Sequence, residues 1–592
     1  MTSETKSCQV CKQSFTIEPE DFHFYEQIKV PPPTWCPDCR RMRRLAWRNE
    51  RTLYPRKCDL CAASILTIYS PDKPRTVYCR ECWYSDKWNP LDYGQDYDFS
   101  KNFFEQFSDL MNRIPYLNLS VTNAENSAYT NYSLNLKNCY LVFGSWECED
   151  CLYSQRIVKT KDVVDSMWLN DCELAYETAY ASKCFEIKDS FDCESCSDVA
   201  FLEHASSCSD CFASVNLRNK SNFVFNQCLS KEDYKRALSE FDLGSYKSLM
   251  ALKAKFKEHA LKFPHPATTG KENVNSTGDL IKNCKNCMNV FVSNEGEDSA
   301  NCCLIEKNFK NCQDLWIAME NTELCYEVVA AGANNFGSKF GLTLYQGCSD
   351  LEYCYTCISS HDSFGSASLK NNKYCILNKQ YSKGEYEVLV EKIRKQMSEQ
   401  KYRDVLGREY GYGEFFPPEL SPFAYNESLA QQYFPSTKEQ AGSSGLMWKE
   451  LAEKNYQITL KAEDLPDHIK DAGDDILKQT IGCLHAGKCN EQCTLGFKII
   501  PAELAFYRKK NIALPRLCFN CRQYERLAAR NPFKLWKRKC NCAGSGSDNA
   551  IYKNQNSHPH GAGRCQNQFQ TSFAPDRPEI IYCEECYQQE IS

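Results

Sequence analysis

The chain has 592 residues, with 71 Lys and Arg against 77 Asp and Glu, and it contains 38 cysteines. A hydrophobic fraction of 42%, with 13% aromatic residues, can fill protein cores and excludes a disordered chain. The net charge of −6 excludes a uniformly basic nucleic-acid coat, although it allows local basic patches. No stretch approaches the roughly 18 apolar residues that a membrane span needs, so we expect no membrane partner.

The cysteine content predicts metal–thiolate sites and buried thiols. The first residues, MTSETKSCQVCK, lack the apolar core of a signal peptide, so we expect a cytoplasmic protein, whose compartment disfavours disulfides. The cysteines form four blocks: eight in residues 8–82, ten in 139–228, ten in 284–375 and ten in 483–586. The two outer blocks resemble each other, and so do the two inner blocks. This pattern indicates a nested duplication.

Repeated spacings in the outer blocks predict zinc sites. The gap from Cys11 to Cys36 and the gap from Cys493 to Cys518 are both 25 residues. Zinc binds four thiolate or imidazole ligands in a tetrahedron, and two C-x-x-C knuckles about 20–25 residues apart can close one such site. Redox C-x-x-C pairs are the less favoured alternative. We therefore predict about four zinc ions in closed structural sites, with the ligands Cys8, Cys11, Cys36 and Cys39; Cys58, Cys61, Cys79 and Cys82; Cys489, Cys493, Cys518 and Cys521; and Cys540, Cys565, Cys583 and Cys586.

An insertion enlarges the last knuckle of the C-terminal copy, between Cys540 and Cys565. It carries Cys542, His558 and His560. These residues could replace a zinc ligand, but we expect them to decorate a loop.

The outer blocks also carry a family resemblance. The residues Cys11-Lys-Gln-Ser-Phe, Phe24-Tyr25-Glu, Val30-Pro31-Pro32 and Cys36-Pro37-Asp38-Cys39-Arg40 resemble the zinc-ribbon (treble-clef type) domain of uncharacterised cysteine-rich bacterial proteins. The segment from Cys493 to Arg522 resembles a second copy, with Phe519 in place of the proline. Some proteins with this layout carry a CaiB/BaiF label. The resemblance implies zinc binding and is nearly silent on biological role.

The inner blocks predict a parallel β-solenoid. They align with each other at a constant offset, from Cys196-Ser-Asp with Cys348-Ser-Asp to Tyr234 with Tyr386, and each has a weak period of about 22–24 residues with Asn/Asp/Ser-Cys steps. Short strands at such a period bury a continuous core only when coils stack. Small apolar cysteines would then form interior ladders. The alternative is that inner cysteine pairs bind metal or a cluster.

These patterns predict a multidomain, mainly β protein, in which terminal double zinc-ribbon modules flank two cysteine-rich β-solenoids with capping helices. Ser230 and Ser382 are predicted N-caps of those helices. The expected segments are 1–88 (N-terminal double ribbon), 120–230 (first solenoid), 231–263 (capping helix), 264–278 (linker), 279–381 (second solenoid), 382–403 (capping helix), 404–480 (aromatic and proline-rich connector) and 481–592 (C-terminal double ribbon).

An arginine row follows the second knuckle in each outer block. Residues 36–57 hold eight Lys and Arg against two acids, and residues 518–542 hold seven against one. A row of arginines on one helix face can bind phosphates. A solvated face, or ion pairs to the acidic middle of the chain, is the alternative interpretation. The nucleic-acid hypothesis names Arg40, Arg44, Arg48, Arg522, Arg526 and Arg530.

The chain lacks nucleotide-binding, serine-hydrolase and metalloprotease motifs of the usual forms, so an enzyme is less favoured than a binding protein. We therefore expect a zinc-binding scaffold that binds RNA, DNA or a ribonucleoprotein through the arginine rows. Two alternatives remain: a metal- or redox-handling protein that uses the inner cysteines, and a scaffold for protein partners.

Overall fold

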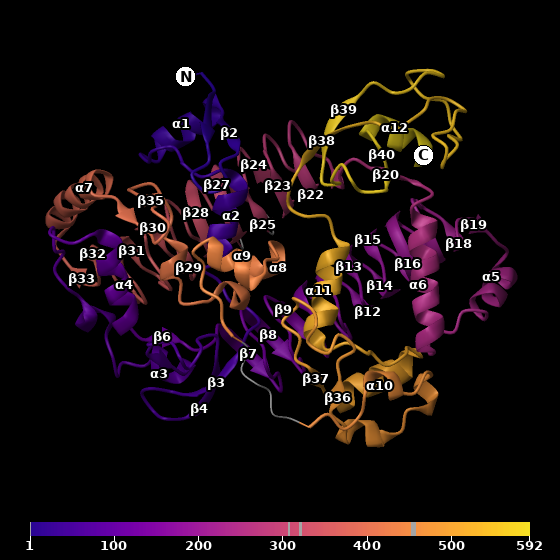
Figure 1. Ribbon diagram of the computed structural model, residues 1–592, viewed down its shortest axis with the longest axis horizontal. Helices are drawn as coiled ribbons and strands as arrows, with labels where there is room; N and C mark the ends of the chain where they lie inside the picture. Colours follow the sequence, from indigo (N-terminus) through magenta and orange to yellow (C-terminus); the bar gives the residue numbers. More distant parts are fainter. Residues whose placement is uncertain (1, 306–307, 319–321, 451–456, 592) are drawn as a thin grey trace. The chain divides into compact units, whose positions relative to one another are not determined.

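The computed structural model describes residues 2–305, 308–318, 322–450 and 457–591 (Figure 1). They divide into two compact units. The first unit contains the residues up to Leu119, the segment Thr268–Glu450 and the short segment Pro532–Leu535. The second unit contains Ser120–Ala267, the described residues from 457 to Asn531, and the residues from Trp536 onward. Each unit thus combines one terminal cysteine module with one inner repeat segment.

The first repeat segment is a parallel β-solenoid with coils of 12 residues. Gln155 pairs with Met167, Met167 with Ala179, and Ala179 with Phe191, so each strand lies beside the strand one coil later. The predicted solenoid is therefore confirmed, and the 22–24-residue period corresponds to two coils. Its strands are β7 (Val121–Glu125), β8 (Ser133–Lys137), β9 (Trp146–Glu149), β10 (Gln155–Val158), β11 (Met167–Asn170), β12 (Glu173–Tyr176), β13 (Ala179–Ser182), β14 (Phe185–Lys188), β15 (Phe191–Glu194), β16 (Ser197–Ser206), β17 (Ser209–Val215), β18 (Ser221–Val224) and β19 (Gln227–Cys228).

A three-residue pattern shapes each coil. Every third residue has a positive φ, as at Asn135 (55°) and Asn138 (54°). The residue that follows is buried, as Leu136 and Cys139 are. Asn and Asp adopt this left-handed conformation more readily than other residues with a side chain. The Asn/Asp-Cys steps in the sequence therefore mark a corner residue followed by an inward side chain.

Cysteines stack inside the first solenoid. Cys172, Cys184, Cys196 and Cys208 occupy the same position of successive coils, and all are buried. Cys172 Sγ lies 3.4 Å from the backbone oxygen of Asn170, so the thiol can donate a hydrogen bond while it fills the core. These cysteines therefore form an interior ladder, as the first interpretation of the inner cysteines predicted.

The second repeat segment is also a parallel solenoid, and some of its coils have one residue more. Phe291 pairs with Cys303, 12 residues later, whereas Cys303 pairs with Trp316, 13 residues later. Its strands are β21 (Gly270–Lys271), β22 (Gly278–Lys282), β23 (Val290–Asn294), β24 (Gly296–Glu297), β25 (Cys303–Ile305), β26 (Phe309–Lys310), β27 (Cys312–Ala318), β28 (Cys325–Ala331), β29 (Leu342–Leu344), β30 (Ser349–Glu352), β31 (His361–Phe364), β32 (Cys375–Ile376) and β33 (Lys379–Gln380).

Each solenoid ends in the same way. The side chain of Asn378 donates to the backbone oxygen of Ala367 and accepts from its N–H, both at 2.8 Å, which occupies the edge of the last coil. Asn226 does the same for Val215. Helices follow, and the predicted N-caps Ser230 and Ser382 are confirmed. The helices are α5 (Lys231–Leu238) and α6 (Tyr246–Ala260) after the first solenoid, and α7 (Lys383–Glu399) after the second. Figure 1 shows α6 beside β16.

The terminal modules contain short hairpins and helices. The N-terminal module holds β1 (Glu4–Ser7), β2 (Ser14–Ile17), α1 (Pro19–Gln27), α2 (Pro37–Leu45), β3 (Tyr54–Lys57), β4 (Ser64–Thr67), β5 (Val77–Tyr78), α3 (Arg80–Tyr84), α4 (Phe103–Arg113) and β6 (Tyr116–Leu117). The C-terminal module holds β36 (Ile481–Gly482), β37 (Gly496–Phe497), α10 (Pro501–Lys510), α11 (Phe519–Ala529), β38 (Trp536–Lys539), β39 (Gln568–Thr571), β40 (Ile580–Tyr582) and α12 (Glu584–Ile591).

The segments between these parts are packed. At the start of the expected linker, β20 (Pro264–Pro266) pairs with β40. β34 (Tyr402–Arg403) lies at the end of the expected capping-helix segment, and the expected connector forms β35 (Glu409–Tyr410), α8 (Leu429–Tyr433) and α9 (Lys438–Ser443); residues 451–456 of the connector lie outside the described residues. Tyr412 of the connector donates to Glu352 of the second solenoid at 3.1 Å. The part of the connector up to Glu450 therefore packs on the flank of the second solenoid, within the first unit.

Candidate metal centres

Four cysteine quartets share one local architecture. In each quartet, two sulfurs come from a hairpin and two come from the start of a helix. In the first quartet, Cys8 and Cys11 lie between β1 and β2, while Cys36 is the N-cap of α2 and Cys39 lies in its first turn. The quartets are Cys8, Cys11, Cys36 and Cys39; Cys58, Cys61, Cys79 and Cys82; Cys483, Cys493, Cys518 and Cys521; and Cys540, Cys565, Cys583 and Cys586.

The sulfur separations match a tetrahedral metal site. The Sγ atoms of Cys11 and Cys36 are 3.7 Å apart, and those of Cys61 and Cys79 are 3.8 Å apart. Two ligands of a tetrahedral zinc with Zn–S bonds of about 2.3 Å are separated by about 3.8 Å. A disulfide would need about 2.05 Å. The quartets therefore have the size of a metal–thiolate site that lacks room for a water ligand.

Backbone hydrogen bonds prepare the quartets for thiolates. In each quartet, the N–H of the third cysteine donates to the sulfur of the first, at 3.2–3.3 Å. The positive end of the helix dipole adds to this effect, because the third cysteine directly precedes the helix. Contacts between the sulfurs shift the thiol pKa values in opposite directions: the side chain of Cys540 lowers the pKa of Cys583 to about 4, whereas the contact with Cys583 raises the pKa of Cys540.

The third quartet differs from the prediction in one ligand. Cys483 completes the group with Cys493, Cys518 and Cys521, in the place where Cys489 was expected. The backbone N–H of Cys518 donates to Cys483 Sγ at 3.3 Å, as the N–H of Cys36 does to Cys8. Cys489 Sγ still lies 3.7 Å from Cys521 Sγ, at the edge of the group. Cys483 lies ten residues before Cys493, so no C-x-x-C spacing marks this pair of ligands.

The predicted phosphate-binding arginines of the N-terminal module are buried inside the first unit. Arg40 and Arg44 on α2 are 2% and 1% exposed. Arg40 Nη2 lies 2.7 Å from Asp314 Oδ2, and Arg44 Nη1 lies 2.8 Å from Asp314 Oδ1. Asp314 is a corner residue of the second solenoid. Arg48, on the same row, is also buried and pairs with Glu50.

The second unit repeats this arrangement. Arg522 Nη1 on α11 lies 2.7 Å from Asp165 Oδ2, and Arg526 Nη1 lies 3.0 Å from Asp165 Oδ1. Asp165 is a fully buried corner residue of the first solenoid. Arg530 is buried as well, and its guanidinium donates to the backbone oxygen of Asn531. The arginine rows therefore join each module to a solenoid, in keeping with the ion-pair alternative.

Further contacts repeat around the two arginine rows. Tyr25 packs edge-on against Tyr326 in the first unit, with ring centroids 5.2 Å apart, and Tyr507 packs edge-on against Tyr176 in the second, at 6.0 Å. In the first unit, Arg43 also pairs with Glu414 at 2.8 Å. Because these charges are removed from water together, the loss of one carboxylate would leave a buried guanidinium without a counter-charge and would destabilise the unit.

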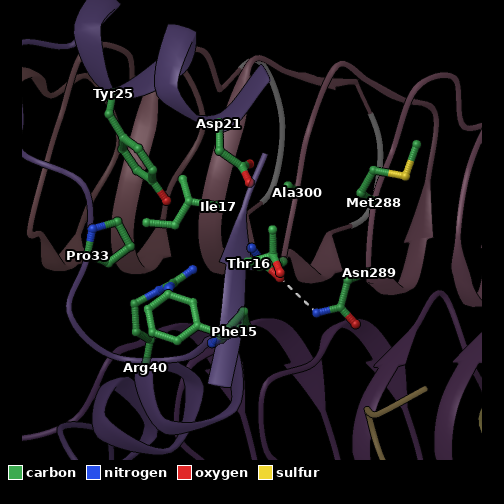
Figure 2. Close-up of a pocket in the computed structure, with 12 residues that line it drawn as sticks. Phe15, Thr16, Ile17, Asp21, Tyr25, Pro33, Arg40, Met288, Asn289 and Ala300 are labelled. Atoms are coloured by element: carbon green, nitrogen blue, oxygen red, sulfur yellow. Dashed lines mark hydrogen bonds between the residues drawn. The ribbon is translucent and has the colours of Figure 1, made fainter. Parts of the chain in front are cut away.

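A small cavity lies beside Arg40, in the seam between the N-terminal module and the second solenoid. Its volume is about 130 Å³, and Ile17, Asp21 and Tyr25 line it from the module side. Figure 2 shows Met288, Asn289 and Ala300 on the solenoid side. Asn289 donates to Asn301 at 2.7 Å, so its amide is already engaged. The cavity is a gap in the module–solenoid contact, of the size of a few water molecules.

The inner and outer cysteines are expected to respond differently to substitution. Cys302 is fully buried, its Sγ lies 3.2 Å from the backbone oxygen of Ala300, and burial raises its pKa well above the usual value. Cys302→Ala should therefore keep all bound metal and destabilise the first unit by only about 1 kcal/mol, the contribution of one hydrogen bond. Cys36→Ala should lose one metal ion per chain. Elemental analysis and urea unfolding measure both effects, and metal loss from Cys302→Ala would contradict the assignment.

Comparisons with protein-family models and with curated proteins find no match to this chain. Within the described residues, no helix combines the length and apolar character that a membrane crossing requires.

Proposed function

We propose that this protein is a zinc-binding scaffold, in which metal–thiolate sites of the zinc-ribbon, treble-clef type organise two terminal modules on two β-solenoids. The observation that carries the proposal is the fourfold repetition of one quartet geometry, with two sulfurs from a hairpin and two from a helix start. Four thiolates in a tetrahedron suit zinc, and a site closed by four protein ligands is structural.

The proposal gives the ion of the first quartet a task beyond its own module. Cys36 and Cys39 lie at the start of α2, the helix that carries Arg40 and Arg44 to Asp314. An ion at this quartet would fix the first turn of α2 and thereby the direction of the arginine row. Metal occupancy would then be coupled to the assembly of the whole unit, as in small domains that fold on metal binding.

The surface that a scaffold offers its partners is then the outside of the solenoids. Stacked coils present regular rows of outward side chains, and solenoid proteins use such extended surfaces for binding. Asn126, Asn138 and Asp150 form one exposed row, linked by hydrogen bonds of 2.9 and 3.0 Å. A protein partner suits such a polar, nearly neutral row better than a phosphate backbone does.

Binding of nucleic acid through Arg40, Arg44, Arg522 and Arg526 stays a prediction. The burial of these side chains argues against it, because a phosphate could not reach them in the folded units. A cytoplasmic location belongs to the present proposal, because all 38 cysteines are free thiols and metal thiolates persist in a reducing compartment.

Elemental analysis of the full chain, purified without chelator, tests the proposal. We expect zinc at no fewer than about four ions per chain, no iron and no colour. Stoichiometric iron would contradict the scaffold and favour metal or redox handling by the inner cysteines. An excess of absorbance near 260 nm that nuclease removes would instead favour the nucleic-acid hypothesis.

A further inference from the structure

A second group of ligand-type side chains lies beside the fourth quartet. It consists of Cys542, His558 and His560 from the inserted segment, together with Cys586 on α12. The four ligand atoms all lie within 4.8 Å of one another. Cys542 and Cys586 are fully buried, and His558 is 5% exposed. The insertion that enlarges this hairpin therefore returns its polar side chains to the module interior.

The separations within this group match a tetrahedral site with mixed ligands. Cys542 Sγ lies 3.6 Å from His558 Nδ1 and 3.4 Å from His560 Nε2. Cys586 Sγ lies 3.3 Å from His560 Nε2. In a zinc tetrahedron with Zn–S of about 2.3 Å and Zn–N of about 2.05 Å, a sulfur and a nitrogen are about 3.6 Å apart.

Both imidazoles are held from behind, as metal-binding histidines are. His558 Nε2 lies 2.9 Å from Glu590 Oε1, and His560 Nδ1 lies 2.8 Å from the backbone oxygen of Gly563. A carboxylate or carbonyl that accepts from one ring nitrogen leaves the lone pair of the other nitrogen free for a metal. The lone pairs of His558 Nδ1 and His560 Nε2 therefore face Cys542.

The sulfur of Cys542 has its own donor. Asn554 Nδ2 lies 3.2 Å from Cys542 Sγ, and Tyr582 donates to Asn554 Oδ1 at 2.5 Å, which fixes the orientation of the amide. A buried amide N–H directed at sulfur stabilises the thiolate form that a metal requires.

We propose that Cys542, His558, His560 and Cys586 bind a fifth zinc ion, and that Cys586 bridges it to the ion of the fourth quartet. Five thiolates, two neutral imidazoles and two Zn²⁺ ions carry a net charge of −1, compared with −2 for an isolated four-thiolate site. The smaller charge makes burial of the pair less costly. The bridge rests on the proposed function, whereas the other three ligands do not.

This fifth ion would crosslink two parts of the C-terminal module, and we propose no such crosslink for the N-terminal module. Cys586 and Glu590 both lie on α12, so the ion would tie the inserted segment to that helix. The matching hairpin of the N-terminal module, between Cys58 and Cys61, has only two residues between its cysteines. The extra site would therefore compensate for the entropy of a longer loop.

The experiment is zinc stoichiometry of the full chain, of three variants of the site and of one control variant. The wild type should hold about five ions per chain, His560→Ala and Cys542→Ser about four, and His560→Cys about five, because a thiolate restores the ligand. His468→Ala is the matched control: this histidine pairs with Asp242 and should leave the count at the wild-type value. Glu590→Gln should weaken the retention of one ion about 10–100-fold in a chelator competition.

A wild-type count of four that His560→Ala does not lower would overturn the fifth site and leave the four-site scaffold intact. If Cys542→Ser lost two ions, the zinc count of His560→Cys would decide between the interpretations. Five ions in His560→Cys would support the bridged pair, and three ions would overturn it. Absence of zinc from the wild type would contradict the proposed function itself.

Discussion

Removal of the metal is expected to unfold both terminal modules and to expose the arginine rows, while the solenoids stay folded. Structural zinc contributes about 10–16 kcal/mol per ion to the folding of small modules, which exceeds the stability of a typical domain. The solenoid cores consist of stacked apolar residues such as Leu169, Ile187 and Leu315, which need no metal.

Limited trypsin digestion before and after treatment with a strong chelator measures this effect. New cleavage is expected after Arg40, Arg44, Arg522 and Arg526, whose side chains are at most 8% exposed in the folded units. Cleavage after the exposed Arg236 on α5 serves as the internal control and should keep its rate. Return of protection when zinc is restored, but not when magnesium is added, completes the test. A digestion pattern that chelation leaves unchanged would show that the modules hold together without metal.

Replacement of Asp314 by asparagine is expected to cost the first unit about 3–5 kcal/mol, because it leaves Arg40 and Arg44 buried without their shared carboxylate. Asparagine keeps the size of the side chain and tolerates the left-handed backbone of this corner residue, which has a φ of 54°. The loss should therefore report the charge and not the backbone. Denaturant unfolding of the full chain, followed by trypsin cleavage in each unit, measures it.

Two matched variants sharpen this test. Asp165→Asn should destabilise the second unit by a similar amount, because Arg522 and Arg526 share Asp165 in the same geometry. Asp298→Asn should have almost no effect, because Asp298 is an exposed corner residue of the second solenoid that accepts a hydrogen bond from the neutral amide of Asn286. If Asp298→Asn were as harmful as Asp314→Asn, the buried ion pairs would not be the cause.

The same aspartate predicts a pH dependence. Burial raises the pKa of Asp314, but Arg40 and Arg44 outweigh burial and hold this pKa below its usual value. The folded state therefore binds a proton less readily than the unfolded chain does. The stabilisation is present above the unfolded value of about 3.9 and is lost as the pH falls through the lower, folded value. Asp314→Asn should remove this part of the acid sensitivity.

The parts of the fold that depend on neighbours in the chain were predictable. A C-x-x-C turn brings two sulfurs together within a few residues, so the hairpin ligands were identified wherever the spacing was regular. The solenoid followed from short strands, from the internal repeat and from Asn-Cys steps such as Asn138-Cys139. Its coil length was missed, because alternating apolar and polar triplets make two 12-residue coils look like one longer repeat.

Cys483 was not predicted as a ligand, and Cys542, His558 and His560 were expected to decorate a loop, for a related reason. Cys483 lies ten residues before Cys493, and Cys542, His558 and Cys586 are spread over 44 residues, so no fixed spacing marks them. One signal was present, since the insertion that carries Cys542 also carries two histidines. Only the folded hairpin shows that these side chains turn back toward α12.

The sequence by itself determined the duplication, the cysteine modules at both ends and the solenoid class, because these features repeat within short, regular stretches of chain. The tertiary structure alone decided which module joins which solenoid: the N-terminal module packs with the second repeat segment, and the C-terminal module packs with the first. It also decided which groups the arginine rows contact. Arg40 meets Asp314 across 274 residues, and Arg522 meets Asp165 across 357. A charged row looks the same in the sequence whether it faces phosphate, water or a buried carboxylate, because burial depends on partners that are distant along the chain.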